Sequence, residues 1–183
     1  SRLKHHFLIA MPQMDDPNFA PSLIYLVDHS SQGAMGLVIN QPNGLNLADV
    51  LEQLRPEITP AEHCLGLPIM SGGPVQTDRG FVLHPAGHHY QATLELGELG
   101  LSTSQDALFA IADQTGPSQY LLAPGYAGWG AGQLETELAE NGWLSCPAAT
   151  AMLFDLPHDQ RLNAAAKCLG VNLALLTRQA GHA

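Results

Sequence analysis

The stretch Ser22–Asn40, SLIYLVDHSSQGAMGLVIN, decides the fold of this chain. Its two ends, Ser22–Val27 and Ala34–Asn40, are rich in the apolar and β-branched residues that favour strands. Between them lie about five polar residues that end in Gly33. Two strand-like runs joined by a short polar connection with a glycine are typical of a β-hairpin. The sequence therefore predicts a strand pair near its N-terminus.

Other short apolar runs, the first of which is closed by Pro12, predict further strands around this hairpin. Their ranges are His5–Met11, Leu67–Met70, Arg79–His84, Ala92–Leu96, Gln119–Ala123 and Ala151–Phe154. Proline and glycine clusters predict turns at Asp16-Pro17, Gln41–Gly44, Ser71–Pro74 and Pro124–Gly132, and a loop over Pro56–Gly66.

Four segments have the spacing of apolar residues that is typical of helices. After Asn46, a predicted N-cap, apolar residues fall at i, i+3, i+4 and i+7. The other three helices are predicted after the caps Ser102–Ser104, over Gln133–Asn141 with Gly142 as the stop, and over Leu162–Leu169 with Gly170 as the stop. Hairpins early in the chain and isolated helices later indicate the α+β class.

The length and the composition favour one domain, spanning residues 1–183. Hydrophobic residues make up 45% of the chain and charged residues 13%, which predicts a substantial core. Seventeen acidic and seven basic residues give a formal charge of −10, and the basic residues form no run. Because DNA binding depends on Lys and Arg side chains that neutralise phosphates, this balance disfavours direct DNA binding.

The cysteines and the apolar runs predict a cytoplasmic protein. Cys64, Cys146 and Cys168 are odd in number and far apart, which fits neither a disulfide framework nor zinc-ligand spacing. No secretory signal is recognisable, and no apolar run is long enough to span a bilayer.

Glycines at positions 125, 128, 130 and 132 precede a predicted helix, which raises the possibility of nucleotide binding. A helix start can hold an anion, and Asp155 closes the next predicted strand, where a dinucleotide fold places its ribose-binding acid. However, the spacing is not GxGxxG, Trp129 is bulky, and no lysine follows. A structural turn is therefore the favoured interpretation.

Three further groups of residues suggest chemistry but have simpler interpretations. His84, His88 and His89 could ligate a metal, yet a polar turn with surface histidines is favoured, so we predict no metal and no cofactor. Glu135, Glu137 and Glu140 are interpreted as a solvated acidic helix face. No GxSxG elbow or other activated nucleophile is present, so no catalytic residue is assigned.

A series of motifs along the whole chain resembles the YqgE/AlgH family, and most closely its pseudomonad members. The motifs are HHFLIAMP (residues 5–12), Asp16-Pro17 with Phe19, GAMGLVIN-x-P (33–42), GGP (72–74), RGFVLH (79–84), TSQD (103–106), GYAGW-x-x-GQLE-x-E (125–137), N-x-WL (141–144) and AGHA (180–183). The resemblance implies a single α+β domain in which a bifurcated, mostly antiparallel sheet curls into a pseudo-barrel with flanking helices.

The resemblance also attaches the chain to transcriptional control of alginate production in bacteria, without an established biochemical activity. Two hypotheses follow: a non-enzymatic regulatory or binding module that contacts a protein or a small ligand, which is favoured, and an enzyme, such as a hydrolase, with a pocket near Arg79 and the GYAGW turn. The matched polar and aromatic residues are the ligand-binding candidates: Asn40, Arg79, Tyr126, Trp129, Gln133 and Glu135.

The charge balance generates a prediction about nucleic acid. We expect no sub-micromolar binding of duplex DNA in a mobility-shift assay at physiological salt, because the chain supplies few phosphate-neutralising side chains. Sub-micromolar binding that weakens steeply with added salt would contradict this prediction.

Overall fold

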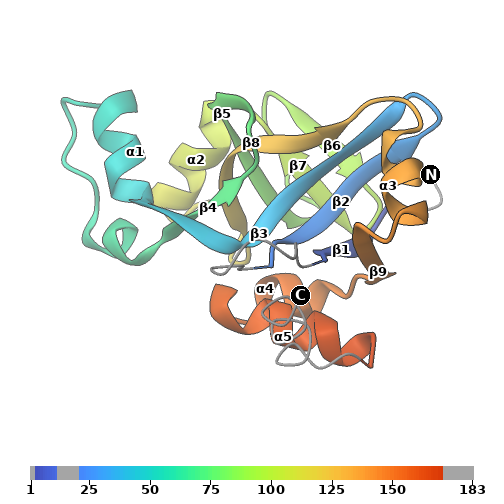
Figure 1. Cartoon of the computed structure of the whole chain (residues 1–183). Coiled ribbons are helices and arrows are strands. Elements are labelled where there is room, and N and C mark those ends of the chain that lie inside the picture. The colour runs from blue at the N-terminus through green and yellow to red at the C-terminus, as the bar shows by residue number, and fades with distance from the viewer. Residues whose placement is uncertain (1–2, 12–20, 171–183) are drawn as a thin grey trace. The chain divides into compact units, whose positions relative to one another are not determined.

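The computed structural model describes residues 3–11 and 21–170 (Figure 1). These residues separate into two units. Unit 1 comprises the described residues up to Gln41 and those from Ala127 onward, and unit 2 comprises residues 42–126. Two strands, β3 (Gly33–Asn46) and β8 (Leu121–Trp129), each contribute residues to both units. The predicted Asp16-Pro17 turn and the AGHA motif lie outside the described residues.

Unit 1 is an antiparallel sheet with three helices. Its strands follow the order β8-β3-β2-β1-β9, and its elements are β1 (His6–Ala10), β2 (Leu23–Ser30), β9 (Trp143–Pro147), α3 (Gln133–Ala139), α4 (Thr150–Phe154) and α5 (His158–Cys168). The predicted hairpin is confirmed, since Ile24 pairs with Val38 and Ser30 pairs with Gly33. Helices α4 and α5 lie side by side, and α5 contacts β1 (Figure 1).

A shared carboxylate ties α3 to the sheet of unit 1. Glu137 Oε1 accepts hydrogen bonds from the indole nitrogens of Trp129 at 3.1 Å and Trp143 at 2.8 Å, and its Oε2 accepts from Gln133 Nε2 at 2.8 Å. Burial alone would raise the pKa of Glu137, but these hydrogen bonds outweigh it and lower the pKa. The interpretation of this helix as a merely solvated acidic face was therefore wrong at Glu137.

Unit 2 is built from a second antiparallel sheet and two helices. Its elements are α1 (Leu47–Leu54), the 3-10 helix η1 (Glu62–Gly66), β4 (Pro68–Gly72), β5 (Val75–Pro85), β6 (Thr93–Leu96), β7 (Leu99–Ser102) and α2 (Gln105–Ala112). Strands follow the order β6-β7-β5-β8, and β4 pairs with β3. Asn46 caps α1 as predicted, with reciprocal 2.9 Å hydrogen bonds to Asp49.

The helices of unit 2 pack onto its sheet through one apolar cluster. Leu51 of α1 and Leu108 and Ile111 of α2 are buried together with Val82 of β5 and Leu122 of β8. The spacing of apolar residues in both helices predicted these faces. The predicted α+β class, with a mostly antiparallel sheet and flanking helices, is confirmed.

Several local predictions were wrong. Gln41–Gly44 is not a turn, because β3 continues to Asn46, and most of Pro124–Gly132 belongs to β8. Ala151–Phe154 lies in the helix α4, so Asp155 follows a helix rather than a strand and the dinucleotide interpretation loses its premise.

Strands β7 and β9 were missed. A run of four or five apolar residues does not by itself distinguish a strand from one helical turn.

His84 is not a surface histidine of a polar turn. It lies in β5 with no exposed surface, and its Nδ1 is 2.8 Å from the carbonyl oxygen of Pro85. A carbonyl oxygen only accepts hydrogen bonds, so Nδ1 carries the proton and donates it to Pro85. Nε2 then accepts a 2.7 Å hydrogen bond from the hydroxyl group of Ser102. Burial lowers the pKa of His84. His88 is half-buried and His89 is exposed, so only His84 departs from the predicted surface position.

The packing around Trp129 predicts a large loss of stability on truncation. Trp129 is 8% exposed and lies edge-to-face on Trp143, with ring centroids 5.8 Å apart. Trp129→Ala should lower the free energy of unfolding by about 3 kcal/mol, measured by urea denaturation followed by circular dichroism. Trp129→Phe keeps an aromatic ring and loses the hydrogen bond to the Glu137 carboxylate, so it should cost less, about 2 kcal/mol. A wild-type midpoint for Trp129→Ala would contradict this packing.

The buried neutral His84 predicts acid sensitivity. Its pKa in the folded state lies below the ordinary value of about 6.5, so unfolding takes up a proton at lower pH. Its stabilising contribution is therefore complete above pH 6.5 and is lost as the pH falls toward the folded-state pKa, by at most about 1.4 kcal/mol per pH unit. Urea midpoints at several pH values should show this slope in the wild type and in His89→Gln. If the urea midpoint of His84→Gln fell with pH as steeply as that of the wild type, His84 would not be the source of the acid sensitivity.

Candidate functional site

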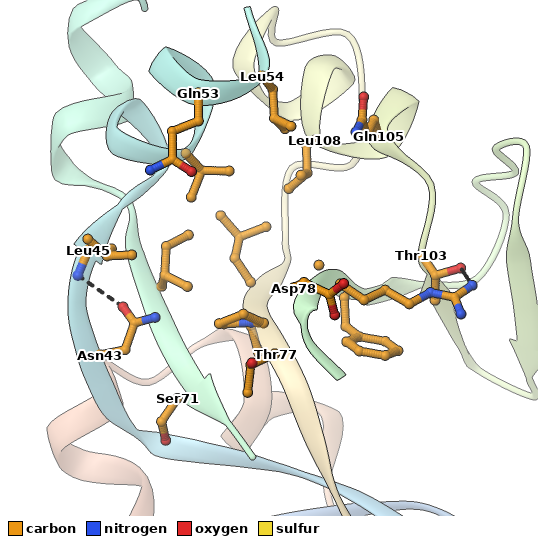
Figure 2. Close-up of a pocket in the computed structure, with 18 of the residues that line it drawn as sticks. Asn43, Leu45, Gln53, Leu54, Ser71, Thr77, Asp78, Thr103, Gln105 and Leu108 are labelled. Carbon is orange, nitrogen blue, oxygen red and sulfur yellow. Dashed lines mark hydrogen bonds between the residues drawn. The ribbon is translucent and has the colours of Figure 1, made fainter. Parts of the chain in front are cut away.

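A cavity of about 530 Å³ opens in unit 2 between its two helices and its strands (Figure 2). Helices α1 and α2, strands β4, β5 and β8 and the end of β3 all contribute lining residues. The apolar part of the lining consists mainly of Leu45, Val50, Leu54, Ile69, Phe81, Leu108 and Leu122. Figure 2 shows Leu54 of α1 and Leu108 of α2 pointing into this space. The cavity therefore offers an apolar interior of a size that suits a small organic molecule.

Two backbone segments that nearly touch lie beside the cavity, and they contribute Ser71 and Pro124 to its lining. Gly72, with φ +67°, lies so close to β8 that a Cβ atom there would be 2.4 Å from the carbonyl oxygen of Pro124. Gly125, with φ +68°, lies against β5, and a Cβ there would be 2.6 Å from the carbonyl oxygen of Gly73. Only glycine combines this backbone conformation with such close approach. These contacts explain why glycines are required at both positions.

Strand β5 bulges away from β8 beside this contact. Val75 pairs with Tyr126 and Gly80 pairs with Pro124, so the four residues 76–79 lie opposite Gly125 alone. Within the bulge Gln76 has φ +51°, an uncommon conformation for a residue other than glycine. Bulges re-aim side chains, and strained residues of this kind cluster at functional sites. Here the bulge supplies Thr77, Asp78 and Arg79 to the cavity lining.

Arg79 occupies the mouth of the cavity. Its Nη2 donates a 3.1 Å hydrogen bond to Oγ1 of Thr103, shown as a dashed line in Figure 2. A second, polar depression adjoins the cavity and is lined by Gln76, Asp78, Arg79, Gly80, Thr103 and Gln105. We call this group of residues the Arg79 rim. Apart from Gln76, all of them also line the apolar cavity, so the two spaces adjoin and share Arg79 as a lining residue.

Two of the sequence-predicted site residues lie in this part of unit 2. Arg79 lines the cavity directly. Tyr126 packs edge-to-face on Phe81, with ring centroids 5.8 Å apart, and Phe81 itself lines the cavity. Tyr126 therefore contacts the lining residue Phe81 without lining the cavity itself. Their roles in ligand binding stay predictions.

The other four predicted residues make internal contacts in unit 1. Asn40 accepts from the amide of Leu23 and donates to the carbonyl oxygen of Pro21, both at 2.9 Å. Trp129 and Gln133 meet on the Glu137 carboxylate. Glu135 Oε1 lies 3.0 Å from Nε2 of the buried His29. The contacts of Asn40, Trp129 and Glu135 join segments of unit 1 that are apart in sequence, and Gln133 supports the Glu137 carboxylate within α3. These are structural roles that the motifs alone did not reveal.

Few of the side chains that line the cavity carry groups used in nucleophilic catalysis. Its hydroxyl groups belong to Ser71, Thr77, Thr103 and Ser104, and its one carboxylate belongs to Asp78. In residues 42–126, all of which the structure describes, no histidine or cysteine lines it. Among the described residues, no group of three or more His, Cys, Asp or Glu side chains is placed to hold a metal ion. A search of the same residues finds no helix long and apolar enough to cross a membrane.

Most of the cavity-lining residues were missed by sequence analysis. Leu54, Leu108 and Leu122 were expected in the core, and nothing in their spacing distinguishes a core position from a cavity wall. Thr103 was visible as part of the TSQD motif and was considered only as a helix cap. Leu45 directly follows the predicted turn Gln41–Gly44, and only the structure shows that it is 47% exposed and lines the cavity.

Comparison with known proteins places the chain in a family. The family model described as AlgH-like matches residues 7–174. A UPF0301 protein of Pseudomonas paraeruginosa is 69% identical over 181 residues, 99% of this chain and 96% of the relative, and the UPF0301 protein AlgH of Pseudomonas aeruginosa is 68% identical over the same shares.

Two solved structures resemble the fold. The solution structure of AlgH from Pseudomonas aeruginosa aligns with a TM-score of 0.83 at 68% identity, covering 99% of this chain and 96% of that one. A crystal structure from Corynebacterium diphtheriae aligns with a TM-score of 0.58 at 22% identity, covering 81% and 78%, and shows a likeness of fold alone. The sequence matches and the structural alignments agree over nearly the whole chain, which therefore belongs to the AlgH-like, or UPF0301, family.

Proposed function

We propose that this protein is a non-enzymatic binding module that takes a small, largely apolar molecule into the cavity of unit 2. The observation that supports this is the lining: apolar side chains from α1, α2, β4 and β8 surround a volume of about 530 Å³, with a few polar groups at the mouth. Binding pockets for small molecules typically have this size and this composition. Such a cavity favours a small molecule over a protein segment as the occupant.

The proposed regulatory role follows from the family resemblance. That resemblance attaches the chain to transcriptional control of alginate production, and the net charge of −10 disfavours direct contact with DNA. A module that reports the presence of a small molecule to another component reconciles the two. In this proposal the occupied cavity, rather than a nucleic-acid surface, is the source of the regulatory effect.

The hydrolase alternative has less support. A serine or threonine hydroxyl becomes a useful nucleophile when a general base lies within hydrogen-bond reach. The hydroxyl of Thr103 accepts a hydrogen bond from Arg79, a group that does not act as a base, and no histidine lines the cavity in the fully described unit 2. The lining therefore favours binding over acyl transfer.

Occupancy of the cavity can be tested with the neutral apolar fluorophore N-phenyl-1-naphthylamine. We expect saturable fluorescence enhancement with about one site per chain, because the ring system leaves water for an apolar wall. Thr77→Trp places a large side chain at an exposed lining position, so it should weaken this binding at least about tenfold while the protein stays folded by circular dichroism.

The matched control is Thr59→Trp, which changes an exposed threonine of the same unit that does not line the cavity. It should bind the fluorophore like the wild type. Absence of saturable binding, or equal weakening by both substitutions, would contradict the proposal. Turnover of a p-nitrophenyl ester that is lost in Thr77→Trp and kept in Thr59→Trp would establish the hydrolase alternative instead.

A further inference from the structure

The charge of unit 2 is distributed in a way that isolates one cation. Residues 42–126 contain nine acidic side chains and two basic ones, Arg55 and Arg79, which gives a formal charge of −7. Arg55 is engaged: its guanidinium carbon lies 4.4 Å from the centre of the Phe109 ring, and its Nη2 lies 3.6 Å from Oδ1 of Asp113. Arg79 is therefore the one cation of unit 2 that is free of an ion pair.

The guanidinium of Arg79 keeps most of its donors available. An arginine side chain carries five N–H donors in a planar fork. Within unit 2, one hydrogen bond from Nη2 to Thr103 holds the group at the cavity mouth. This single contact orients the fork and leaves its remaining donors for an acceptor in the cavity. Carboxylates and phosphates are the groups whose oxygen geometry matches such a fork.

The neighbouring acidic groups limit where an anion can bind. Asp106 lies in the first turn of α2, which adjoins the Arg79 rim, so this helix start already carries a negative charge. Asp78 lines both the cavity and the rim (Figure 2) and repels a second negative charge. An anionic group in the cavity mouth thus has Arg79 as its cationic partner.

Resting on the proposed function, we infer that the ligand of the cavity is an amphipathic molecule with one terminal oxyanion, a carboxylate or a phosphate ester. Its apolar body lies among Leu54, Leu108 and Leu122, and its oxyanion accepts hydrogen bonds from Arg79 at the mouth. An apolar space and an adjoining polar depression that share Arg79 as a lining residue form the arrangement that such a molecule fits. The strained bulge around Gln76 is what holds Arg79 at this junction.

Three ligands of equal chain length test the inference by displacement of the fluorophore: decanoate, decyl phosphate and the neutral 1-decanol. In the wild type, the better of the two anions should bind about tenfold more tightly than 1-decanol, and added salt should reduce this difference. Comparison of decanoate with decyl phosphate identifies which oxyanion the site prefers.

Two variants separate the charge interaction from a structural effect. Arg79→Gln should bind the anions no more tightly than 1-decanol, while its affinity for 1-decanol should stay within about twofold of the wild type. Asp78→Asn should act in the opposite direction and raise the affinity for the anions about two- to threefold, because it removes a repulsive charge. Both side chains are exposed, so both variants should keep the wild-type urea midpoint.

The outcomes distinguish this inference from the proposed function on which it rests. Suppose that 1-decanol and the fluorophore bind, but the anions bind no more tightly than 1-decanol, or Arg79→Gln still binds the anions more tightly by the full factor. Either outcome overturns the oxyanion inference and leaves the proposed binding module standing. If neither the fluorophore nor any of the three ligands binds, both are overturned.

Discussion

The near contact between Gly72–Gly73 and Pro124–Gly125 is the constraint on which the candidate site depends. Two backbone segments approach so closely that a side chain on either glycine would collide with a carbonyl oxygen of the other segment. This contact brings the end of β4 and the following turn against β8, next to the point where the β5–β8 ladder shifts its register. At that point strand β5 bulges over residues 76–79, and the bulge carries Arg79 to the mouth of the cavity.

The functional and structural roles of the family's motifs can be separated by their contacts. In unit 1, the aromatic and polar motif residues satisfy one another: Trp129, Trp143 and Gln133 all donate to Glu137, and Asn40 holds the start of β2. A carboxylate that accepts three hydrogen bonds positions a helix on a sheet and has little capacity left for a ligand. In unit 2, by contrast, Arg79 makes one contact and faces an open volume. This difference is why the proposed chemistry is assigned to unit 2.

Membership of the AlgH-like family establishes what the chain is related to, and the cavity suggests what it does. High identity over nearly the whole length carries the fold from the Pseudomonas aeruginosa AlgH structure to this chain. It does not supply a reaction, so the proposal rests on the physical chemistry of the lining. An acidic unit with one unpaired arginine beside an apolar space selects against multiply charged anions, because Asp78 and the net charge oppose additional negative groups.

The sequence by itself determined the elements whose signals are local. The hairpin of β2 and β3 follows from strand-forming runs around a polar turn, α1 follows from Asn46 and the spacing of its leucines, and the absence of basic runs follows from composition. Only the tertiary structure decided that Gln41–Gly44 and Pro124–Trp129 are extended, because partner strands distant in sequence impose that conformation on residues that otherwise favour turns. It also decided that Leu54, Leu108 and Arg79 surround one cavity. Apolar spacing specifies which face of a helix is turned inward, whereas a cavity is space left between elements, and that space depends on the close approach of two glycines more than fifty residues apart.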